Sequence, residues 1–234
     1  MNIQIILVQP KYEGNLGSVA RVMKNFGFKK LILVNPCKID KTAKIMSAHA
    51  KDVLENAIIV NSIEDAIIES DIVVGTTGAR GIKKDEHIRM PFFTPKELKN
   101  KLNGKSGVID ILFGREDNGL SNTELKLCDM ILTIPTSEEY PIMNLSHAVA
   151  VVLYELSDIQ SGEICLADGM DLRLLYEHFD EFLNDINYPE HKKNKTSLMI
   201  RRVLGRAELT GREVYTLHGI LKHVQWQIGP KRKR

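Results

Sequence analysis

Short apolar segments alternate with amphipathic ones through the first two-thirds of the chain. The apolar segments are rich in Ile and Val and lack strict alternation with polar residues, which is typical of strands buried on both faces. Because helical patterns separate these segments, we predict a parallel α/β sheet. The six predicted strands are Ile3–Val8, Leu31–Val34, Ile58–Val60, Ile72–Val74, Val108–Phe113 and Met130–Ile134.

The clearest helical pattern lies between the first two predicted strands. Its apolar residues recur at helical spacing from Leu16 to Phe26, and Gly27 supplies the usual stop. Thr94 and Ser121 precede two shorter patterns as candidate N-caps. The further helices predicted in this part of the chain are Ile63–Glu69, Pro95–Leu102, Leu125–Cys128 and Leu145–Leu156.

The pattern changes after residue 156. Residues 157–171 hold Gly162 and Gly169 and show little periodicity, which indicates a linker. We therefore predict an α/β domain over residues 1–158, a linker over 159–169 and a small all-α domain over 170–234. The three helices predicted in that last domain are Met170–Ile186, Ser197–Ala207 and Arg212–Gln227.

Composition excludes several classes of protein. The chain has 234 residues, of which 43% are hydrophobic, and no apolar run approaches the roughly 20 residues that a membrane-spanning helix needs. Residues 1–9 lack the features of a secretory leader, so we expect a cytoplasmic protein. The three cysteines are odd in number and far apart, which argues against a disulfide framework and against a metal site.

The formal net charge of +2 conceals an uneven distribution of charge along the chain. Residues 155–190 carry one basic and ten acidic side chains, whereas residues 191–234 carry twelve basic and two acidic ones. A local excess of cations favours a polyanionic partner such as RNA. A solvated lysine-rich surface is the alternative, although the basic residues interleave with apolar ones in a helical pattern up to Trp226.

Candidate chemistry gathers in four loops that follow predicted strands. Ligands of open parallel sheets bind beyond the carboxyl ends of the strands, so these loops are where a site is expected. Glycines in the first two allow close approach to a backbone, but the first lacks the Gly-x-Gly-x-x-Gly fingerprint of dinucleotide binding, and tight turns explain its glycines equally well. The four loops are Glu13–Ser18, Gly75–Gly81, Phe113–Leu120 and Ile134–Ser146.

The third and fourth loops carry the more unusual polar residues. Arg115 and Glu116 follow a buried strand directly, so we expect them to pair with each other or with another polar group; a salt-bridged surface turn is the alternative. Two prolines stiffen the fourth loop, whose backbone would suit an adenine ring. Asn144 lies at the probable start of a helix, where capping is as good an explanation as ligand binding.

The order of these segments, taken together, resembles the three motifs of the SPOUT class of RNA methyltransferases. The resemblance spans residues 1–158, and it extends more loosely from Arg201 to Leu221. Within the class, the chain is similar to the TrmJ branch of the TrmH-like group, which methylates the ribose 2′-oxygen of nucleotide 32 in the tRNA anticodon loop. The motifs are Asn15-Leu16-Gly17 with Arg21 and Asn25, Phe113–Glu116 with Gly119-Leu120, and Ile134-Pro135 with Asn144-Leu145-Ser146.

The resemblance implies a fold, a cofactor and an assembly. The C-terminal part of the sheet would thread a deep trefoil knot, S-adenosylmethionine would bind in the loops, and two copies would form a homodimer with the site at their interface. No metal is implied. By position, the implied cofactor-binding residues are Thr76, Thr77, Gly78, Gly114, Ile134, Ile142, Met143 and Asn144.

The same resemblance assigns catalytic roles. Arg21 falls on the catalytic arginine of the first motif, Asn15 would order the first loop, and Arg115 would hold RNA phosphate or the partner subunit. Glu116 would fix Arg115. The chain departs from the commoner Ser-Leu-Asn pattern, because Ile142 replaces the serine and its hydroxyl.

The basic C-terminal domain supplies the predicted RNA contacts. Tyr215 and Trp226 are candidates for base stacking, although aromatic residues in helices belong more often to a core. The predicted phosphate contacts are Arg201, Arg202, Arg206, Arg212 and Lys222.

Two other functions stay open from the sequence. One is a methyltransferase of the same class that acts on ribosomal RNA or on another position of tRNA, and the other is a non-catalytic RNA-binding protein that kept the fold. The presence of Arg21, Asn15, Glu116 and Asn144 disfavours the latter. A nucleotide-dependent dehydrogenase would need the missing glycine fingerprint.

Overall fold

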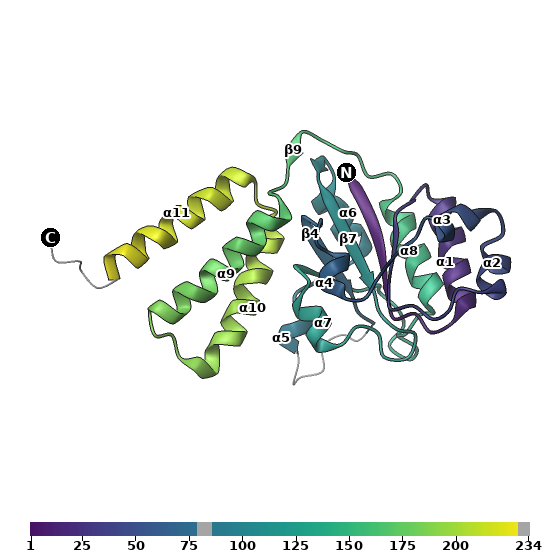
Figure 1. The fold of residues 1–234 in the computed structure, drawn as a ribbon, viewed down its shortest axis with the longest axis horizontal. Helices are drawn as coiled ribbons and strands as arrows, with labels where there is room; N and C mark the ends of the chain where they lie inside the picture. The colour runs from purple at the N-terminus through teal and green to yellow at the C-terminus, as the bar shows by residue number, and fades with distance from the viewer. Residues whose placement is uncertain (79–85, 229–234) are drawn as a thin grey trace.

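The computed structural model describes residues 1–78 and 86–228, which fold around a seven-stranded sheet (Figure 1). The strand order is β3-β2-β1-β7-β4-β8-β5, and every pairing within this sheet is parallel, as the sequence predicts. The strands are β1 (Asn2–Val8), β2 (Leu31–Val34), β3 (Ile58–Val60), β4 (Ile72–Thr76), β5 (Phe92–Phe93), β7 (Val108–Phe113) and β8 (Met130–Leu132).

The strands differ from the expected ones at several ends. β1 begins one residue earlier, at Asn2, and β4 runs two residues further, to Thr76. β8 ends at Leu132 rather than at Ile134, so the loop that follows it begins two residues earlier. β5 has only two residues, too few to produce a recognisable hydrophobic pattern, and the sequence did not predict it. It pairs with β8 at the edge of the sheet.

The first face of the sheet holds the larger core. Ile5 and Leu7 of β1 point to this face and are fully buried, while the intervening Ile6 points to the other face, which is also buried. This is why the strands appear as continuous apolar runs. The helices that cover the first face are α1 (Glu13–Asn25), α2 (Lys41–Ser47), α3 (Lys51–Glu55), α6 (Pro95–Leu102) and α8 (Leu145–Leu156), with a 3₁₀ turn at Ala48–Ala50.

Helix α2 was not predicted because its sequence has no apolar stripe. Only Ala43 and Ser47 are buried in it, whereas Ile45 and Met46 face solvent. It packs closely on α1: a Cβ at Gly17 would lie 2.3 Å from the carbonyl oxygen of Ala43. The glycine in the first loop therefore serves packing between helices.

The second face is covered by shorter helices. They are α4 (Ile63–Ala66), α5 (Glu86–Arg89) and α7 (Asn122–Lys126). Ser121 caps α7 by accepting from the backbone N–H of Glu124, and Glu124 reciprocates at the N–H of Ser121, so the helix begins before the expected Leu125. Leu198, from the C-terminal helices, completes this core.

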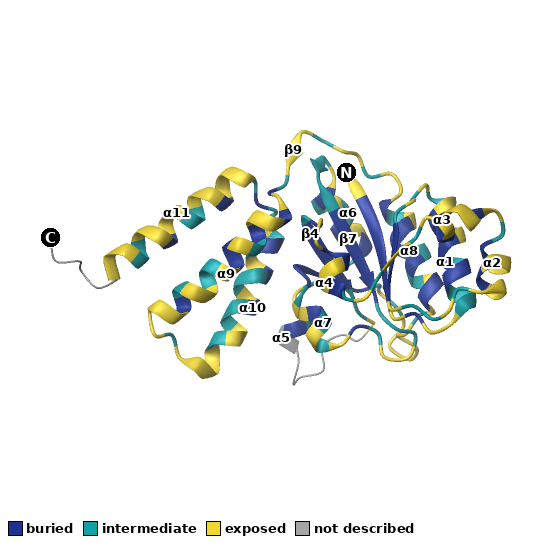
Figure 2. Cartoon of the chain, viewed as in Figure 1, coloured by how far each residue is buried: buried dark blue, intermediate teal, exposed yellow. Residues whose placement is uncertain are grey.

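Three long helices form the C-terminal region at one end of the sheet (Figure 1). They are α9 (Gly169–Asp185), α10 (Glu190–Ala207) and α11 (Gly211–Ile228). α10 begins seven residues before the expected Ser197. Buried Leu175, Tyr176, Val214 and Leu221 give these helices a core of their own, and much of their outer surface is exposed (Figure 2).

The segment that connects the two regions has more structure than a plain linker. Within it, β9 (Ile164–Cys165) pairs in parallel with β6 (Lys105–Ser106). Gly162 lies against Gly104, where an added Cβ would come within 1.8 Å of the carbonyl oxygen. The sequence predicts a linker here but not this pairing, because the two strands are far apart in the sequence.

Asp129 joins the sheet to the helical region. Its carboxylate accepts from the backbone N–H of Val73 at 2.9 Å and from the Tyr176 hydroxyl at 3.2 Å, and it lies 3.5 Å from Arg201. Gly205 of α10 packs on it, since a Cβ there would lie 2.6 Å from the Cβ of Asp129. Burial raises the pKa of Asp129, and Arg201 opposes that shift.

Candidate active site

The second, third and fourth predicted loops surround one cavity at the carboxyl edge of the sheet. Its volume is about 200 Å³. Seven of the eight residues expected to bind a cofactor lie on its wall, although they come from three separate segments of sequence. These residues are Thr76, Thr77, Gly78, Gly114, Ile134, Ile142 and Met143.

Other wall residues were not predicted as cofactor contacts, although several of them lie in the same predicted loops. Arg89 and Thr136 are polar, and Leu132, Leu145 and Ala148 supply apolar surface. Asp117 and Asn118 also face the cavity. The wall thus combines apolar surface with carboxylates, a composition that suits a flat ring carried on a cationic or polar chain.

Glycines bring the loops close enough to form this wall. A Cβ at Gly114 would lie 2.1 Å from the carbonyl carbon of Gly119 and 2.2 Å from the nitrogen of Leu120. A Cβ at Gly78 would lie 2.7 Å from Cδ1 of Ile142. The first contact is with backbone, which cannot move aside as a flexible side chain can. Of the second loop, residues 79–81 lie outside the described residues.

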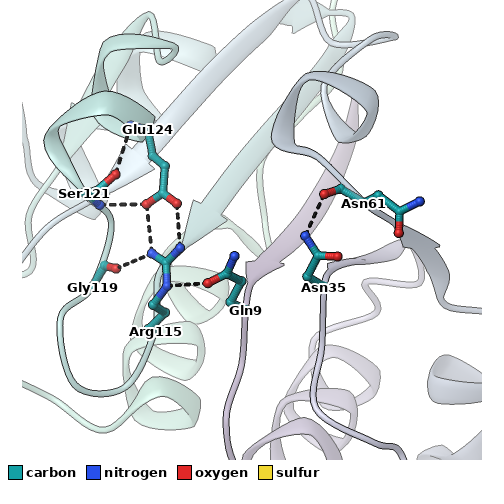
Figure 3. A network of polar contacts seen from close by, with 7 residues as sticks. All are labelled: Gln9, Asn35, Asn61, Arg115, Gly119, Ser121 and Glu124. Carbon is teal, nitrogen blue, oxygen red and sulfur yellow. Dashed lines mark hydrogen bonds and ion pairs between the residues drawn. The ribbon is translucent and has the colours of Figure 1, made fainter.

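Arg115 pairs with Glu124 rather than with Glu116 (Figure 3). Its two terminal nitrogens donate to the two carboxylate oxygens of Glu124 at 3.0 and 2.8 Å, and Nε donates to Gln9 at 2.8 Å. Burial alone would raise the pKa of Glu124, but hydrogen bonds from Arg115 and Ser121 outweigh it and lower the pKa. The pair remains ionised and fixes the third loop on α7.

The expected role of Glu116 was therefore wrong. Its carboxylate accepts from the backbone N–H groups of Lys11 and Tyr12 and from the side-chain amide of Asn15. Glu116 therefore fixes the first loop and does not fix the side chain of Arg115. The signal for the true partner of Arg115 was present in the sequence as Ser121-x-x-Glu124, a capping box one helix further along.

Asn144 continues this chain of contacts into the fourth loop. Its Nδ2 donates to Oδ1 of Asn15 at 3.2 Å, and its Oδ1 accepts from the N–H of Ser146 to cap α8. It is the one expected cofactor residue that is not on the cavity wall. Capping explains its position, and the same side chain connects the first and fourth loops.

Arg21 lies apart from the cavity within the described chain. It is exposed on α1 and is not among the residues of the cavity wall. The side chain that the resemblance makes catalytic is therefore not brought together with the cofactor-binding loops within one copy of the described chain.

The predicted RNA contacts divide into buried and exposed residues. Arg202 is only 3% exposed and donates to the carbonyl oxygens of Ile88 and Leu125, so it is occupied inside the protein and the prediction of a phosphate contact was wrong for it. Arg201 stacks on Tyr176 beside Asp129. Arg206 is half-buried, and Arg212 and Lys222 are exposed.

The described residues contain neither a metal-binding cluster nor a membrane-spanning helix. Across residues 1–78 and 86–228, no cluster of His, Cys, Asp and Glu could hold a metal ion. In the same ranges, every helix is too short or too polar to cross a membrane.

Comparison with known proteins agrees with this arrangement. Residues 2–154 match the model of the SpoU rRNA methylase family, and residues 170–233 match the C-terminal domain of tRNA methyltransferase TrmJ. The chain belongs to the SpoU methylase family, in its TrmJ branch. The resemblance drawn from the three motifs is confirmed, and the protein is a methyltransferase.

Relatives and solved structures cover nearly the whole chain. The tRNA (cytidine-2′-O-)-methyltransferase TrmJ of Methanocaldococcus jannaschii is 45% identical, over 94% of this chain and 98% of its own. The tRNA (cytidine/uridine-2′-O-)-methyltransferase TrmJ of Pectobacterium atrosepticum is 34% identical, over 96% and 97%. The crystal structure of TrmJ from Z. mobilis ZM4 superposes with a TM-score of 0.77 at 29% identity, over 96% of this methyltransferase and all of that chain.

A more distant structure shares the fold alone. The SpoU methyltransferase AviRb from Streptomyces viridochromogenes, in complex with the cofactor AdoMet, superposes with a TM-score of 0.52 at 20% identity. The match covers 67% of this chain and 59% of that one.

Proposed function

We propose that this methyltransferase transfers a methyl group from S-adenosylmethionine to a ribose 2′-oxygen of tRNA, at nucleotide 32 of the anticodon loop. The observation that carries the proposal is the cavity enclosed by the loops after β4, β7 and β8. The names of the relatives support tRNA and the 2′-oxygen, and the motif resemblance supports the position.

The cavity fits this cofactor in shape and charge. The close approach of Gly114 to Gly119 and of Gly78 to Ile142 holds the loops together around the cavity. Leu145 and Ala148 suit an adenine ring, while Glu116 and Asp117 suit a cationic sulfonium chain. The serine hydroxyl missing at Ile142 is no obstacle if backbone groups hold the cofactor. When bound, the cofactor supplies an electrophilic methyl carbon.

The protein must position the ribose and help its 2′-hydroxyl to lose a proton. Arg21 is a poor base because guanidinium stays protonated. We assign it two roles: it grips the neighbouring phosphate with two hydrogen bonds, and it stabilises the oxyanion as the proton leaves to a phosphate oxygen or to water. Transfer would form the bond between the methyl carbon and the 2′-oxygen and break the bond between that carbon and the sulfonium sulfur, so that S-adenosylhomocysteine is the second product.

Since Arg21 does not line the cavity of its own protomer, a second copy supplies it. A homodimer whose site lies at the interface is what the resemblance implies, and the exposed position of Arg21 on α1 supports it. In the same proposal the loop 133–144 is threaded in a trefoil knot, which its place on one cavity wall with the β7 loop and the contact of Asn144 with Asn15 support.

The proposal divides the chain into a catalytic domain over residues 1–158, a connection over 159–169 and an RNA-binding domain over 170–234. The separate core of helices α9 to α11 supports this division. Arg206, Arg212 and Lys222 remain as phosphate contacts, so tRNA binding should weaken steeply with salt.

The test is methyl transfer to unmodified tRNA transcripts from labelled donor, followed by mapping of the modified nucleotide. A transcript with 2′-deoxyribose at the mapped nucleotide should accept no label. Methylation of ribosomal RNA, or of another tRNA position, would show that the proposed substrate is wrong. Uptake of the cofactor without methyl transfer to any RNA would favour the alternative of a non-catalytic RNA-binding protein.

A further inference from the structure

Helix α11 carries two stripes of side chains on different sides. The inner stripe packs on α9 and consists of Val214, His218, Leu221 and Gln225. The outer stripe follows the same intervals of three and four residues, which keep side chains on one side of a helix. Its members are Arg212, Tyr215, Gly219, Lys222 and Trp226.

The outer stripe faces solvent along its whole length. Tyr215 is 81% exposed and Trp226 is 74% exposed, although both are large aromatic residues. An added Cβ at Gly219 would meet no atom within 4 Å, so the middle of the stripe is open. The expectation that these aromatic residues belong to a core was wrong, because α11 buries its other side.

Cations alternate with rings along this stripe. Arg212 precedes Tyr215 by three residues, and Lys222 precedes Trp226 by four. The one acidic residue of α11, Glu213, is already bound to Thr210 at the start of the helix. At a rise of about 1.5 Å per residue, the two rings stand about 16 Å apart, too far to hold the same base.

We propose that this stripe, Arg212 to Trp226, binds an unpaired segment of the RNA substrate, with bases stacked on Tyr215 and Trp226 and phosphates held by Arg212 and Lys222. Exposed rings beside cations are the general means of holding single strands, because each base has a face that stacks. A duplex hides those faces. The inference rests on the proposed function, since it describes how the same RNA is held.

A second copy of this chain is the competing occupant. Parallel packing of two outer stripes would bring Arg212 and Lys222 of one copy against those of the other, and such like-charge contacts are unfavourable. Antiparallel packing about Gly219 would avoid them but would leave the cations of both copies without an anion, because Glu213 is bound to Thr210. An RNA strand instead carries the charge that these cations need. The charges therefore favour RNA.

Trp226 is the only tryptophan in the chain, so its fluorescence reports on this helix alone. We would titrate the full chain with a single-stranded oligoadenylate, with a blunt RNA duplex of equal length, and with unmodified tRNA. Stacking predicts strong quenching by the single strand and by tRNA, and little by the duplex. Equal quenching by the duplex, or binding of tRNA without quenching, would overturn the proposal.

Substitutions separate the rings from the charges. Tyr215→Leu and Trp226→Leu should each weaken single-strand binding by about 5- to 100-fold, and this loss should persist at high salt. Arg212→Gln and Lys222→Gln should instead flatten the dependence of binding on salt. Ile220→Ala, at a 55% exposed position on another side of α11, is the matched control and should bind as wild type.

Methyl transfer and oligomeric mass distinguish a failure of the stripe proposal from a failure of the proposed function. If the wild type methylates tRNA but the Leu variants bind and turn over tRNA unchanged, only the stripe is refuted. If the wild type methylates no tRNA, the proposed function fails. If the Leu variants lose dimer mass in light scattering, a second copy covers the stripe and the inference is wrong.

Discussion

Asn15 Nδ2 donates a hydrogen bond of 2.8 Å to Oε1 of Glu116. The two residues are about a hundred positions apart, and their contact ties the first turn of α1 to the loop after β7. Glu116 also accepts from the N–H groups of Lys11 and Tyr12, so one carboxylate fixes the start of the first motif. Through Asn144, the same contacts reach the cap of α8.

Replacing Glu116 with Ala should impair methyl transfer more than folding. Hydrogen bonds to a charged group are worth about 1.5–3 kcal/mol, and losing one such contribution from the site would lower kcat/KM about tenfold or more. Glu116→Gln keeps one carbonyl acceptor and should retain more activity. The measurements are steady-state kinetics and thermal unfolding.

The control is Asp52→Asn. At the other end of α1, Oδ1 of Asp52 lies 2.7 Å from Nζ of Lys24, and both side chains are about half exposed. Exposed ion pairs contribute little, so its kinetics should match wild type. Equal activity of the Glu116→Ala variant would show that the first loop does not depend on this carboxylate.

Gly114 should tolerate no side chain. An added Cβ would lie 2.1 Å from backbone of Gly119, so Gly114→Ala must push the third loop open and deform the cavity. We expect cofactor affinity to fall at least about tenfold, with destabilisation of about 1–3 kcal/mol from the forced backbone shift. Calorimetry with S-adenosylmethionine and denaturant unfolding would measure the two effects.

Gly14→Ala is the matched substitution in the first loop. A Cβ there would meet its nearest atom, in Met46, at 4.0 Å, which is ordinary contact. Alanine at this helical position should leave cofactor binding unchanged and stabilise α1 slightly. If both alanine variants bind the cofactor equally, the close approach at Gly114 does not shape the cavity.

The sequence predicted those parts of the fold whose pattern is local. β1, β7 and α8 appear because their apolar residues are contiguous or recur at helical spacing. Helix α2 was not predicted because its exposed Ile45 and Met46 break the apolar stripe. Strand β9 was not predicted because its partner strand lies some sixty residues earlier. Long-range pairing leaves no local signal.

The sequence predicted which residues gather at the site, but not which side chains bond to one another. The family resemblance grouped Gly78, Gly114 and Met143, which spacing alone could not do, and all three lie on one cavity. Adjacency suggested that Glu116 holds Arg115, whereas Arg115 pairs with Gly119 at the base of a tight turn and Glu116 lies in that turn, so the two side chains find different partners. The charge pattern also could not distinguish the buried Arg202 from the exposed Arg212.

Asp110 should make stability depend on pH. It is 1% exposed in the central strand β7, and burial raises its pKa to about 7. The folded protein therefore keeps a proton that the unfolded chain releases above about pH 4, so stability should fall as pH rises from about 4 to 7 and then level off. The full effect is at most about 4 kcal/mol, from about 1.4 kcal/mol per pKa unit.

Asp110→Asn removes the titration and keeps the shape. Its free energy of unfolding, relative to wild type at the same pH, should be similar at pH 4.5 and clearly greater at pH 8. Comparing the two proteins at each pH cancels the other titrating groups. A difference that stays constant between those pH values would contradict a raised pKa in the folded protein.

Arg21 should act on the cavity of a second copy. It is exposed on α1 and does not line the cavity beside it, so Arg21→Ala should destroy transfer while leaving cofactor binding intact. Gly114→Ala should lose cofactor binding while leaving Arg21 intact. Each protein alone is expected to be inactive, and each lacks a different half of the site.

Mixing the two variants tests which copy supplies the arginine. In a dimer that exchanges subunits, half of the dimers pair one variant with the other, and each such dimer has one cavity and one arginine that are both intact. Activity should therefore recover to about a quarter of that of wild type at equal subunit concentration, a consequence of random pairing in a two-fold dimer. If Arg21 instead served its own cavity, every site in the mixture would lack either the arginine or the cofactor, and no activity would return.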